Sequence, residues 1–502
     1  MIHRHIVLKV LLVAFVLALA TGCGSTHGTS TAIRIPTNPT SPPAEPGPPA
    51  ATFVPELAQA IVANGTAVPV PSQFLGLAHE WAAPQIGIGA QLLMGDQASG
   101  VNTIYRQLLA NLTSYGSGPL VIRIGGDSTD TFSTAQSIEA FKELNAYNGA
   151  LFYLGVNLKT ATLSEAKAMA STYYQSMPPG SLLGLEIGNE PDLYGVPEAQ
   201  FIANFTSWAA GIRSVTSSKL PILGPSCSAW ACNNGVWTDD VMSTAIAGNV
   251  ATFSQHQYIE GQSPVPDALL QSSAYPNAST AEALIAQTHQ AGLPFRLGEW
   301  NSDWAAYTTV SSQFQSALWA IKSLYLYASW GADGVNIFGN LDGNNGYNMI
   351  QFDVAQGSPN VYTLDQVFPL YYGALAFQMG TGHQAQVYPV NVTAGTSSAV
   401  SAFDTIDSTG TERMTLINFD ETNHGEVTID PQGTYRTAQV CYLSAPSYQS
   451  STGVTLCGQT FDGSTDGTIH GSPEYTTLEP NSGGGFSIPL QTTEAAIVTF
   501  TK

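Results

Sequence analysis

Two glutamates each close an apolar run that has the composition of a buried strand. Glu190 ends the segment LEIGNE at 185–190, and Glu299 ends the segment FRLGE at 295–299. Pro191 follows Glu190 directly, and because proline cannot continue a β-ladder, the chain must leave the strand at that point. Two carboxyl groups presented at strand ends can divide the work of an acid and a base.

Cleavage of a glycosidic bond is a reaction that needs such a pair. One carboxyl group protonates the leaving oxygen, and an ionised one faces the developing oxocarbenium ion. Their environments must therefore push the two pKa values apart. Strand alternation predicts that Glu190 shares a face with Gly188, Glu186 and Gly184, so that the glycines leave room for a sugar. A separation of about 5–5.5 Å would indicate a retaining mechanism.

Strand candidates alternate with helical patterns from Phe74 to Gly339. Alternation predicts parallel strands joined by helices, and eight such units predict a (β/α)8 TIM barrel. An open doubly wound sheet is the competing fold, but FLGLAHEW is not followed by the glycine-rich turn of that fold. The strand candidates are residues 74–81, 120–127, 151–158, 182–190, 220–226, 251–258, 294–300 and 332–339.

Several polar residues near these strand ends are expected to support the pair. Arg123 is a natural partner for Glu186 in a buried ion pair one layer below Glu190. Asp127 is expected to hold a loop, and His256 to hydrogen-bond behind the catalytic groups, since no third ligand accompanies it at metal spacing. We therefore expect neither a metal nor a cofactor. Trp300, directly after Glu299, could stack on a sugar ring.

The remaining chain divides into an accessory domain and an N-terminal tether. Residues 381–502 contain short alternating runs separated by Gly, Pro, Asn and Asp, which predicts an antiparallel β-sandwich. The segment 52–72 is expected to join that sandwich, which leaves 73–380 for the catalytic barrel. Residues 24–51 are rich in Ser, Thr, Pro and Gly, and this composition predicts a disordered tether.

The first 23 residues resemble a bacterial lipoprotein signal. A basic start is followed by an apolar run too short to span a bilayer and then by Cys23, the expected lipid attachment point. An ordinary signal peptide cut near Cys23 is the alternative. Either reading predicts export, with a cell-surface or periplasmic lipoprotein as the first choice.

Four further cysteines fit an oxidising compartment. Their close spacing predicts two disulfides, Cys227–Cys232 and Cys441–Cys457. A zinc site is disfavoured, because no CxxC pattern or nearby histidine accompanies either pair.

The formal net charge of −21 excludes a nucleic-acid partner, because phosphate binding needs a basic face. The expected partner is a carbohydrate, the expected membrane contact is the lipid anchor alone, and the expected state is a monomer.

Four motifs resemble glycoside hydrolase family 79 of clan A, and the resemblance covers roughly residues 52–502. They are RIGGDSTD (123–130), LEIGNEPD (185–192), HQY (256–258) and PLYYGALAF (369–377). The resemblance implies an exo-β-glucuronidase of the bacterial type that works by double displacement.

The same resemblance implies a role for each matching residue. Glu190 would be the acid/base and Glu299 the nucleophile. Asn189 would bind the sugar 2-hydroxyl, Glu80 would bind ring hydroxyls, and Tyr258 would orient the nucleophile. The uronate carboxylate would be held by neutral donors in the loop after strand eight, with Tyr347 as the candidate side chain. Two alternatives stay open: a clan A retaining glycosidase for neutral sugars, and an inactive glycan-binding lipoprotein.

Overall fold

The computed structural model describes residues 51–81, 94–96, 100–228, 246, 248–259, 265–303, 310–341, 348–354, 362–395 and 399–502. Residues 1–50 lie outside these ranges, and with them the predicted signal segment, Cys23 and nearly all of the tether. Within the described ranges, none of the helices combines the length and apolar character that a bilayer crossing requires.

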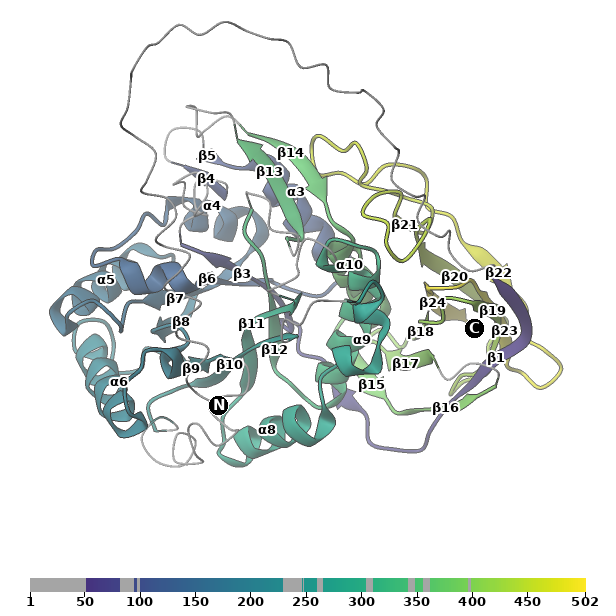
Figure 1. Cartoon of the computed structure of the whole chain (residues 1–502), viewed down its shortest axis with the longest axis horizontal. Coiled ribbons are helices and arrows are strands. Elements are labelled where there is room, and N and C mark those ends of the chain that lie inside the picture. The colour runs from purple at the N-terminus through teal and green to yellow at the C-terminus, as the bar shows by residue number, and fades with distance from the viewer. Residues whose placement is uncertain are drawn as a thin grey trace, which may run out of the picture. The chain divides into compact units, whose positions relative to one another are not determined.

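Eight parallel strands close into a barrel, which confirms the predicted TIM-type fold (Figure 1). Each strand candidate contributes one strand. In the order of the ring these are β10 (Thr252–Ile259), β11 (Phe295–Asp303), β12 (Gly334–Phe338), β3 (Leu75–Glu80), β6 (Val121–Gly125), β7 (Leu151–Val156), β8 (Leu182–Ile187) and β9 (Ile222–Cys227).

Helices cover the outside of this ring, and their ends follow local capping rules. At the start of α5, Thr162 and Glu165 form a reciprocal capping box, which satisfies two backbone N–H groups. Asn102 caps α3 by accepting hydrogen bonds from two backbone N–H groups of the first turn. The described helices are α3 (Thr103–Leu112), α4 (Glu139–Asn148), α5 (Leu163–Ser176), α6 (Glu198–Arg213), α8 (Ala278–Gln290), α9 (Gln315–Ser329) and α10 (Pro369–Thr381).

Short elements complete the barrel region. Among the described residues, four 3₁₀ turns and two small antiparallel pairs lie near its loops, and two of these turns follow barrel strands. They are η1 (Asp127–Thr131), η2 (Pro191–Leu193), η3 (Ala268–Leu270), η4 (Ser272–Ala274), β4 (Gly95–Asp96) with β5 (Gly100–Val101), and β13 (Ile350–Val354) with β14 (Tyr362–Val367).

The C-terminal strands form two sheets around their own apolar core, with Val427, Ile488 and Val498 fully buried. The smaller sheet has the order β16 (Val390–Ala394), β1 (Thr52–Val62), β19 (Asn423–Asp430) and β23 (Phe486–Leu490). The larger sheet contains β2 (Val68–Pro69), β15 (Gln386–Tyr388), β17 (Val400–Ile406), β18 (Glu412–Asn418), β24 (Glu494–Thr501), β20 (Thr437–Ser444), β21 (Thr455–Leu456) and β22 (Thr476–Leu478).

The N-terminal strand β1 lies between strands of the C-terminal domain, where its purple ribbon stands among green and yellow ones (Figure 1). It pairs antiparallel with β16 but parallel with β19, so this sheet is not purely antiparallel. A parallel pair needs no hairpin, and it can therefore join segments that are far apart in the chain.

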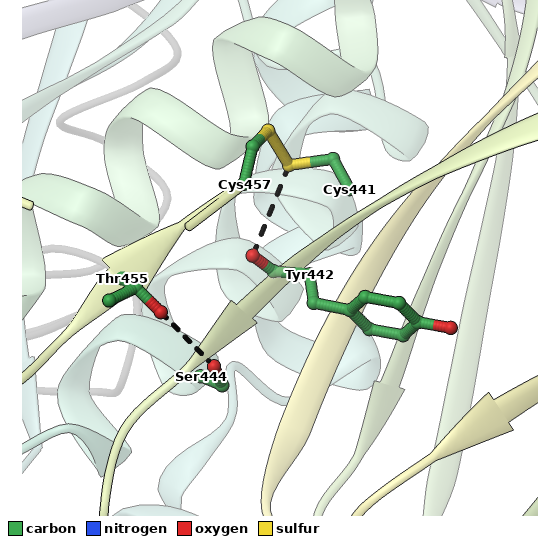
Figure 2. Close-up of a disulfide and its surroundings, with 5 residues drawn as sticks. All are labelled: Cys441, Tyr442, Ser444, Thr455 and Cys457. Carbon is green, nitrogen blue, oxygen red and sulfur yellow. Dashed lines mark hydrogen bonds between the residues drawn. A yellow bond between two sulfur atoms is a disulfide. The ribbon is translucent and has the colours of Figure 1, made fainter. Parts of the chain in front are cut away.

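One predicted disulfide lies in the larger sheet. Cys441 on β20 is bonded to Cys457, just beyond β21, with 4.7 Å between the two Cα atoms (Figure 2). The Cys441–Cys457 prediction is confirmed. Cys227 is also disulfide-bonded and buried at the end of β9, but Cys232 lies outside the described residues, so that pairing stays a prediction.

Candidate active site

The carboxyl ends of β6, β8, β10 and β11 bring a set of charged and polar side chains to one end of the barrel. An oxygen of Glu190, an oxygen of Glu299 and a ring nitrogen of His256 all lie within 4.8 Å of one another. The two carboxylates predicted from strand ends therefore converge. Their side chains remain partly accessible, 20% for Glu190 and 10% for Glu299, as a substrate-facing pair requires.

Glu190 reaches this position through a reversed backbone and not through strand alternation. Strand β8 ends at Ile187, and Gly188 then has φ +81°. Glu190 itself has φ 44° and ψ 56°, a left-handed conformation that is costly for a residue with a Cβ. The assumption that alternation extends from Glu186 to Glu190 was wrong, because the strand ends first. Such strain is stored most often where a side chain must be aimed.

Arg123 holds three groups of the site with one guanidinium. Its Nε lies 2.7 Å from Glu186 Oε2, its Nη1 2.5 Å from Glu299 Oε2, and its Nη2 2.8 Å from Asn189 Oδ1. The ion pair with Glu186 is the predicted one, and the direct contact with Glu299 was not foreseen. Burial lowers the pKa of Arg123, but the charges of Glu186 and Glu299 outweigh that effect and raise it. The arginine therefore stays charged in the barrel.

A planar fork of N–H donors suits this arrangement, because each donor meets a different acceptor in fixed geometry. Ser226, at the end of β9, donates from Oγ to Glu186 Oε1 over 2.5 Å. Glu186 thus acts as a buried anchor for Arg123 and lies below the reacting groups.

Two residues of β10 complete the frame around the carboxylates. Tyr258 donates from its hydroxyl to Glu299 Oε1 over 2.6 Å, and this contact matches the role that the family resemblance implied. His256 Nε2 lies 3.4 Å from Arg123 Nη2, and its Nδ1 lies 3.2 Å from Glu190 Oε1.

These contacts determine the proton position on His256. Arginine can only donate, so His256 Nε2 is the acceptor and Nδ1 carries the hydrogen that faces Glu190. Burial lowers the pKa of His256, with the nearby Glu299 charge opposing this and Arg123 reinforcing it. A neutral histidine therefore donates to Glu190 while Arg123 neutralises Glu299.

Glu80 makes the loop contacts that were expected of Asp127, and its predicted binding of ring hydroxyls stays a prediction. Glu80 at the end of β3 accepts from the backbone N–H groups of Asp127 and Ser128 over 3.0 and 2.9 Å, and also from the Ser128 hydroxyl. The residue that pins this loop is therefore Glu80, whereas Asp127 was expected to do so. Asp127 Oδ1 instead accepts from Asn189 Nδ2 over 3.2 Å. Burial raises the pKa of Glu80 to about 7.

The prediction that Trp300 stacks on a sugar is wrong. Trp300 is 1% exposed, and its ring stacks on Trp319 of α9 with centroids 4.4 Å apart. Because neighbouring strand residues point to opposite faces, the orientation of Glu299 toward the lumen sends Trp300 into the helical layer. Tyr347 lies outside the described residues, and its role stays a prediction.

Two residues of the site were not foreseen. Tyr194 accepts from the backbone N–H of Asn189 over 2.8 Å and donates to Asp130 Oδ1 over 2.6 Å. The only signal was the position of Tyr194, five residues after Asn189 in the same motif. Such spacing around a turn does not specify a contact.

The chemistry open to this arrangement is acid/base and nucleophilic. The carboxyl group of Glu190 lies beside the neutral donor His256. It faces the carboxylate of Glu299, which Arg123 and Tyr258 hold. The same three ligand atoms of Glu190, His256 and Glu299 have a separation that a metal ion could use. A divalent cation would, however, have to approach Glu299 beside the Arg123 guanidinium, which repels it.

Comparison with known proteins agrees with the fold. The glycosyl hydrolase family 79 C-terminal beta domain matches residues 402–497. A β-glucuronidase of Aspergillus niger is 24% identical over 383 residues, 64% of this chain and 68% of that protein.

Solved structures share the whole architecture at low identity. A 4-O-α-L-rhamnosyl-β-D-glucuronidase from Fusarium oxysporum 12S aligns over 89% of this chain and 100% of its own, with a TM-score of 0.68 and 17% identity. A GH51 arabinofuranosidase from Xanthomonas axonopodis pv. citri covers 88% of this chain and all of its own, with a TM-score of 0.63 and 14% identity.

The fold is thus that of a clan A glycoside hydrolase, a (β/α)8 barrel with a β-domain attached. The domain match, the β-glucuronidase relative and the glucuronidase structure support the family predicted from the motifs, glycoside hydrolase family 79, and the prediction of a glycoside hydrolase, whereas the bacterial type stays a prediction.

Proposed function

We propose that the chain is a retaining glycosidase that releases β-linked glucuronic acid, with Glu299 as nucleophile and Glu190 as acid/base. The observation that carries the mechanism is the 4.8 Å limit on the separation of their oxygens. Retaining enzymes hold their carboxyl groups about 5–5.5 Å apart, whereas inverting ones need about 6.5–9.5 Å to admit a water. The short distance between the facing oxygens supports the retaining class.

The surroundings of the two groups support this division of roles. Glu299 is neutralised by Arg123 and oriented by Tyr258, which suits a carboxylate that must attack the anomeric carbon. Glu190 is more exposed and accepts a hydrogen bond from neutral His256, which suits a group that gains and loses a proton. The Asn189 side chain accepts a hydrogen bond from Arg123 and donates one to Asp127, so its amide lies beside these two residues.

The uronate preference is supported by the β-glucuronidase of Aspergillus niger and by the Fusarium oxysporum glucuronidase. The net charge of −21 also suits a site that holds the substrate carboxylate with neutral donors, among which Tyr347 remains the candidate. The deciding test is a panel of para-nitrophenyl glycosides, with the anomer of the first product followed by NMR. We expect hydrolysis of the β-glucuronide with retention. An inverted product would contradict the mechanism, and a preference for neutral sugars would contradict the substrate.

Export and lipid attachment at Cys23 are also part of the proposal, on the strength of the N-terminal pattern. In a bacterial host, the full chain should fractionate with membranes and carry a lipid-modified N-terminus by mass spectrometry. The Cys23→Ser variant should lose both properties. Equal membrane association of the two chains would contradict the anchor.

A further inference from the structure

A series of hydrogen bonds holds the turn that carries Glu190, and it is made by residues other than the two carboxylates. The Asn189 N–H donates to the Tyr194 hydroxyl, which donates to Asp130, and Asp130 lies 3.4 Å from Lys159 Nζ. Asp130 is 4% exposed and belongs to η1, directly after β6. These hydrogen bonds therefore tie the turn after β8 to the turn after β6.

We propose that Tyr194 is a positioning residue for acid/base catalysis, because it holds the strained turn that aims Glu190 and Asn189. This inference rests on the proposed function and deepens it. Tyr194 is neither of the two groups proposed to react with the substrate. Its hydroxyl acts through the backbone of Asn189, one residue before Glu190.

The local geometry makes this hydroxyl an integral part of the turn. A Cβ placed on Gly188 would lie 2.9 Å from the Tyr194 hydroxyl, and Gly188 already has φ +81°. The glycine is thus required both by its conformation and by the close approach of Tyr194. The left-handed Glu190 that follows is strained, and the surrounding contacts must offset that strain.

The turn η1 holds Asn189 at two separate points. Asp127 accepts from the Asn189 side chain, and Asp130 acts through Tyr194 on the Asn189 main chain. Burial raises the pKa of the Tyr194 hydroxyl, so the group stays protonated and can donate and accept at once. The Lys159 ammonium lies over the Tyr194 ring, 5.0 Å from its centroid, and makes a cation–π contact with it.

A matched control exists on the outside of the barrel. Tyr173 of α5 is also buried, and its hydroxyl also accepts a backbone N–H, that of Gln136, over 3.1 Å. Its ring stacks on Trp81 in the helical layer. Tyr173→Phe therefore removes the same kind of hydrogen bond from a hydroxyl that contacts Gln136 and not the turn that carries Glu190.

The kinetic test compares Tyr194→Phe with Tyr173→Phe on aryl glycosides whose leaving groups differ in acidity. For a phenyl glycoside, which needs protonation, kcat/KM of Tyr194→Phe should fall on the order of tenfold, the effect of one hydrogen bond. For a 2,4-dinitrophenyl glycoside, which leaves unaided, the loss should stay below about threefold. Tyr173→Phe should match the parent on both. An equal loss on both substrates, or no loss on either, would overturn the proposal.

Two further measurements separate this inference from the proposed activity. Hydrogen exchange of the segment 186–194, followed by mass spectrometry, should be faster in Tyr194→Phe than in the parent or in Tyr173→Phe, whatever the substrate is. Unchanged exchange would overturn the inference even in an active enzyme. Asp130→Ala, which removes the acceptor of the Tyr194 hydroxyl, should behave like Tyr194→Phe, and parent kinetics in this variant would overturn the inference. If Glu190→Gln and Glu299→Gln lose no activity, the proposed function fails independently of these results.

Discussion

The barrel mouth and the β-domain both bury pairs of carboxyl groups, but they stabilise them in different ways. At the mouth, Glu186 and Glu299 share the guanidinium of Arg123. In the β-domain, Asp404 of β17 and Glu412 of β18 are fully or almost fully buried, and no ion pair joins either of them to a cation within the described residues. The positive charge of Arg123 offsets the burial of Glu186 and Glu299. Neutral hydrogen-bond donors and a bound proton offset the burial of Asp404 and Glu412.

The β-domain pair is surrounded by neutral groups. Gln432 donates from Nε2 to Asp404 Oδ2 over 2.8 Å and from its backbone to Glu412 Oε1 over 2.7 Å. Tyr435 donates to Glu412 Oε2 over 2.5 Å. Burial, and then the Glu412 charge, raise the pKa of Asp404 to about 8. Catalysis needs an ionised carboxylate, so the mouth uses arginine, whereas a purely structural pair can hold a proton instead.

The largest effect should follow from removing the proposed nucleophile at the mouth. Glu299→Gln keeps the shape of the side chain and one acceptor oxygen for Arg123 but cannot attack, so kcat should fall by roughly a thousandfold or more, which is above about 4 kcal/mol in barrier. Steady-state hydrolysis of the preferred aryl glycoside measures this. Parent-like rates in a correctly folded variant would remove Glu299 from the mechanism.

The next largest effect should follow from replacing Arg123, the cation that pairs with the carboxylates at the mouth. Arg123→Met should destabilise the protein by about 3–5 kcal/mol, because it leaves Glu186 and Glu299 buried without their cation. Urea unfolding at pH 7 gives the value. As a comparison, Lys142→Met removes only an exposed ion pair with Glu139 and should cost less than about 1 kcal/mol. Similar losses in both variants would show that burial of charge is not the deciding factor.

A smaller effect is expected from the disulfide of the β-domain. Replacing Cys441 and Cys457 by serine opens a loop of 16 residues, and the stability should fall by about 3 kcal/mol. The kcat/KM of the folded protein should not change, because these residues have no contact with the mouth. Thermal melting with and without reductant provides the measurement, and a loss of activity before unfolding would contradict this separation.

The smallest and most specific effect is the pH dependence of the Asp404 pair. The pKa of Asp404 in the folded state is raised to about 8 from its ordinary value of 3.8, so the folded state binds more protons between these values. Its contribution to stability is therefore complete below about pH 4 and is lost as the pH rises through about 8. Asp404→Asn removes this dependence, and its stability relative to the parent should rise across that window. Melting curves at pH 4, 6 and 8 test the sign, and parallel curves for the two proteins would refute it.

Much of this protein was predictable because its strongest signals are local. Apolar runs alternating with helical patterns defined the eight barrel strands, and polar residues at their ends marked the mouth. Glu190 and Glu299 were identified in this way, since the carboxyl ends of barrel strands meet at one end whatever the details of packing. The pairing of Cys441 with Cys457 followed from their closeness in the chain.

Other features depended on the directions of side chains, which only the tertiary structure determines. Strand β8 ends before Glu190, so a left-handed turn and not alternation aims that side chain. Glu80 pins the loop that Asp127 was expected to hold, and Trp300 lies in the core. Asp404 and Glu412 meet because two neighbouring strands fix their register. The sequence by itself determined which residues end each strand, because periodicity and chain-breaking residues act locally. The tertiary structure decided which groups share a proton, a charge or a hydrogen bond, because those contacts join distant segments and depend on side-chain direction.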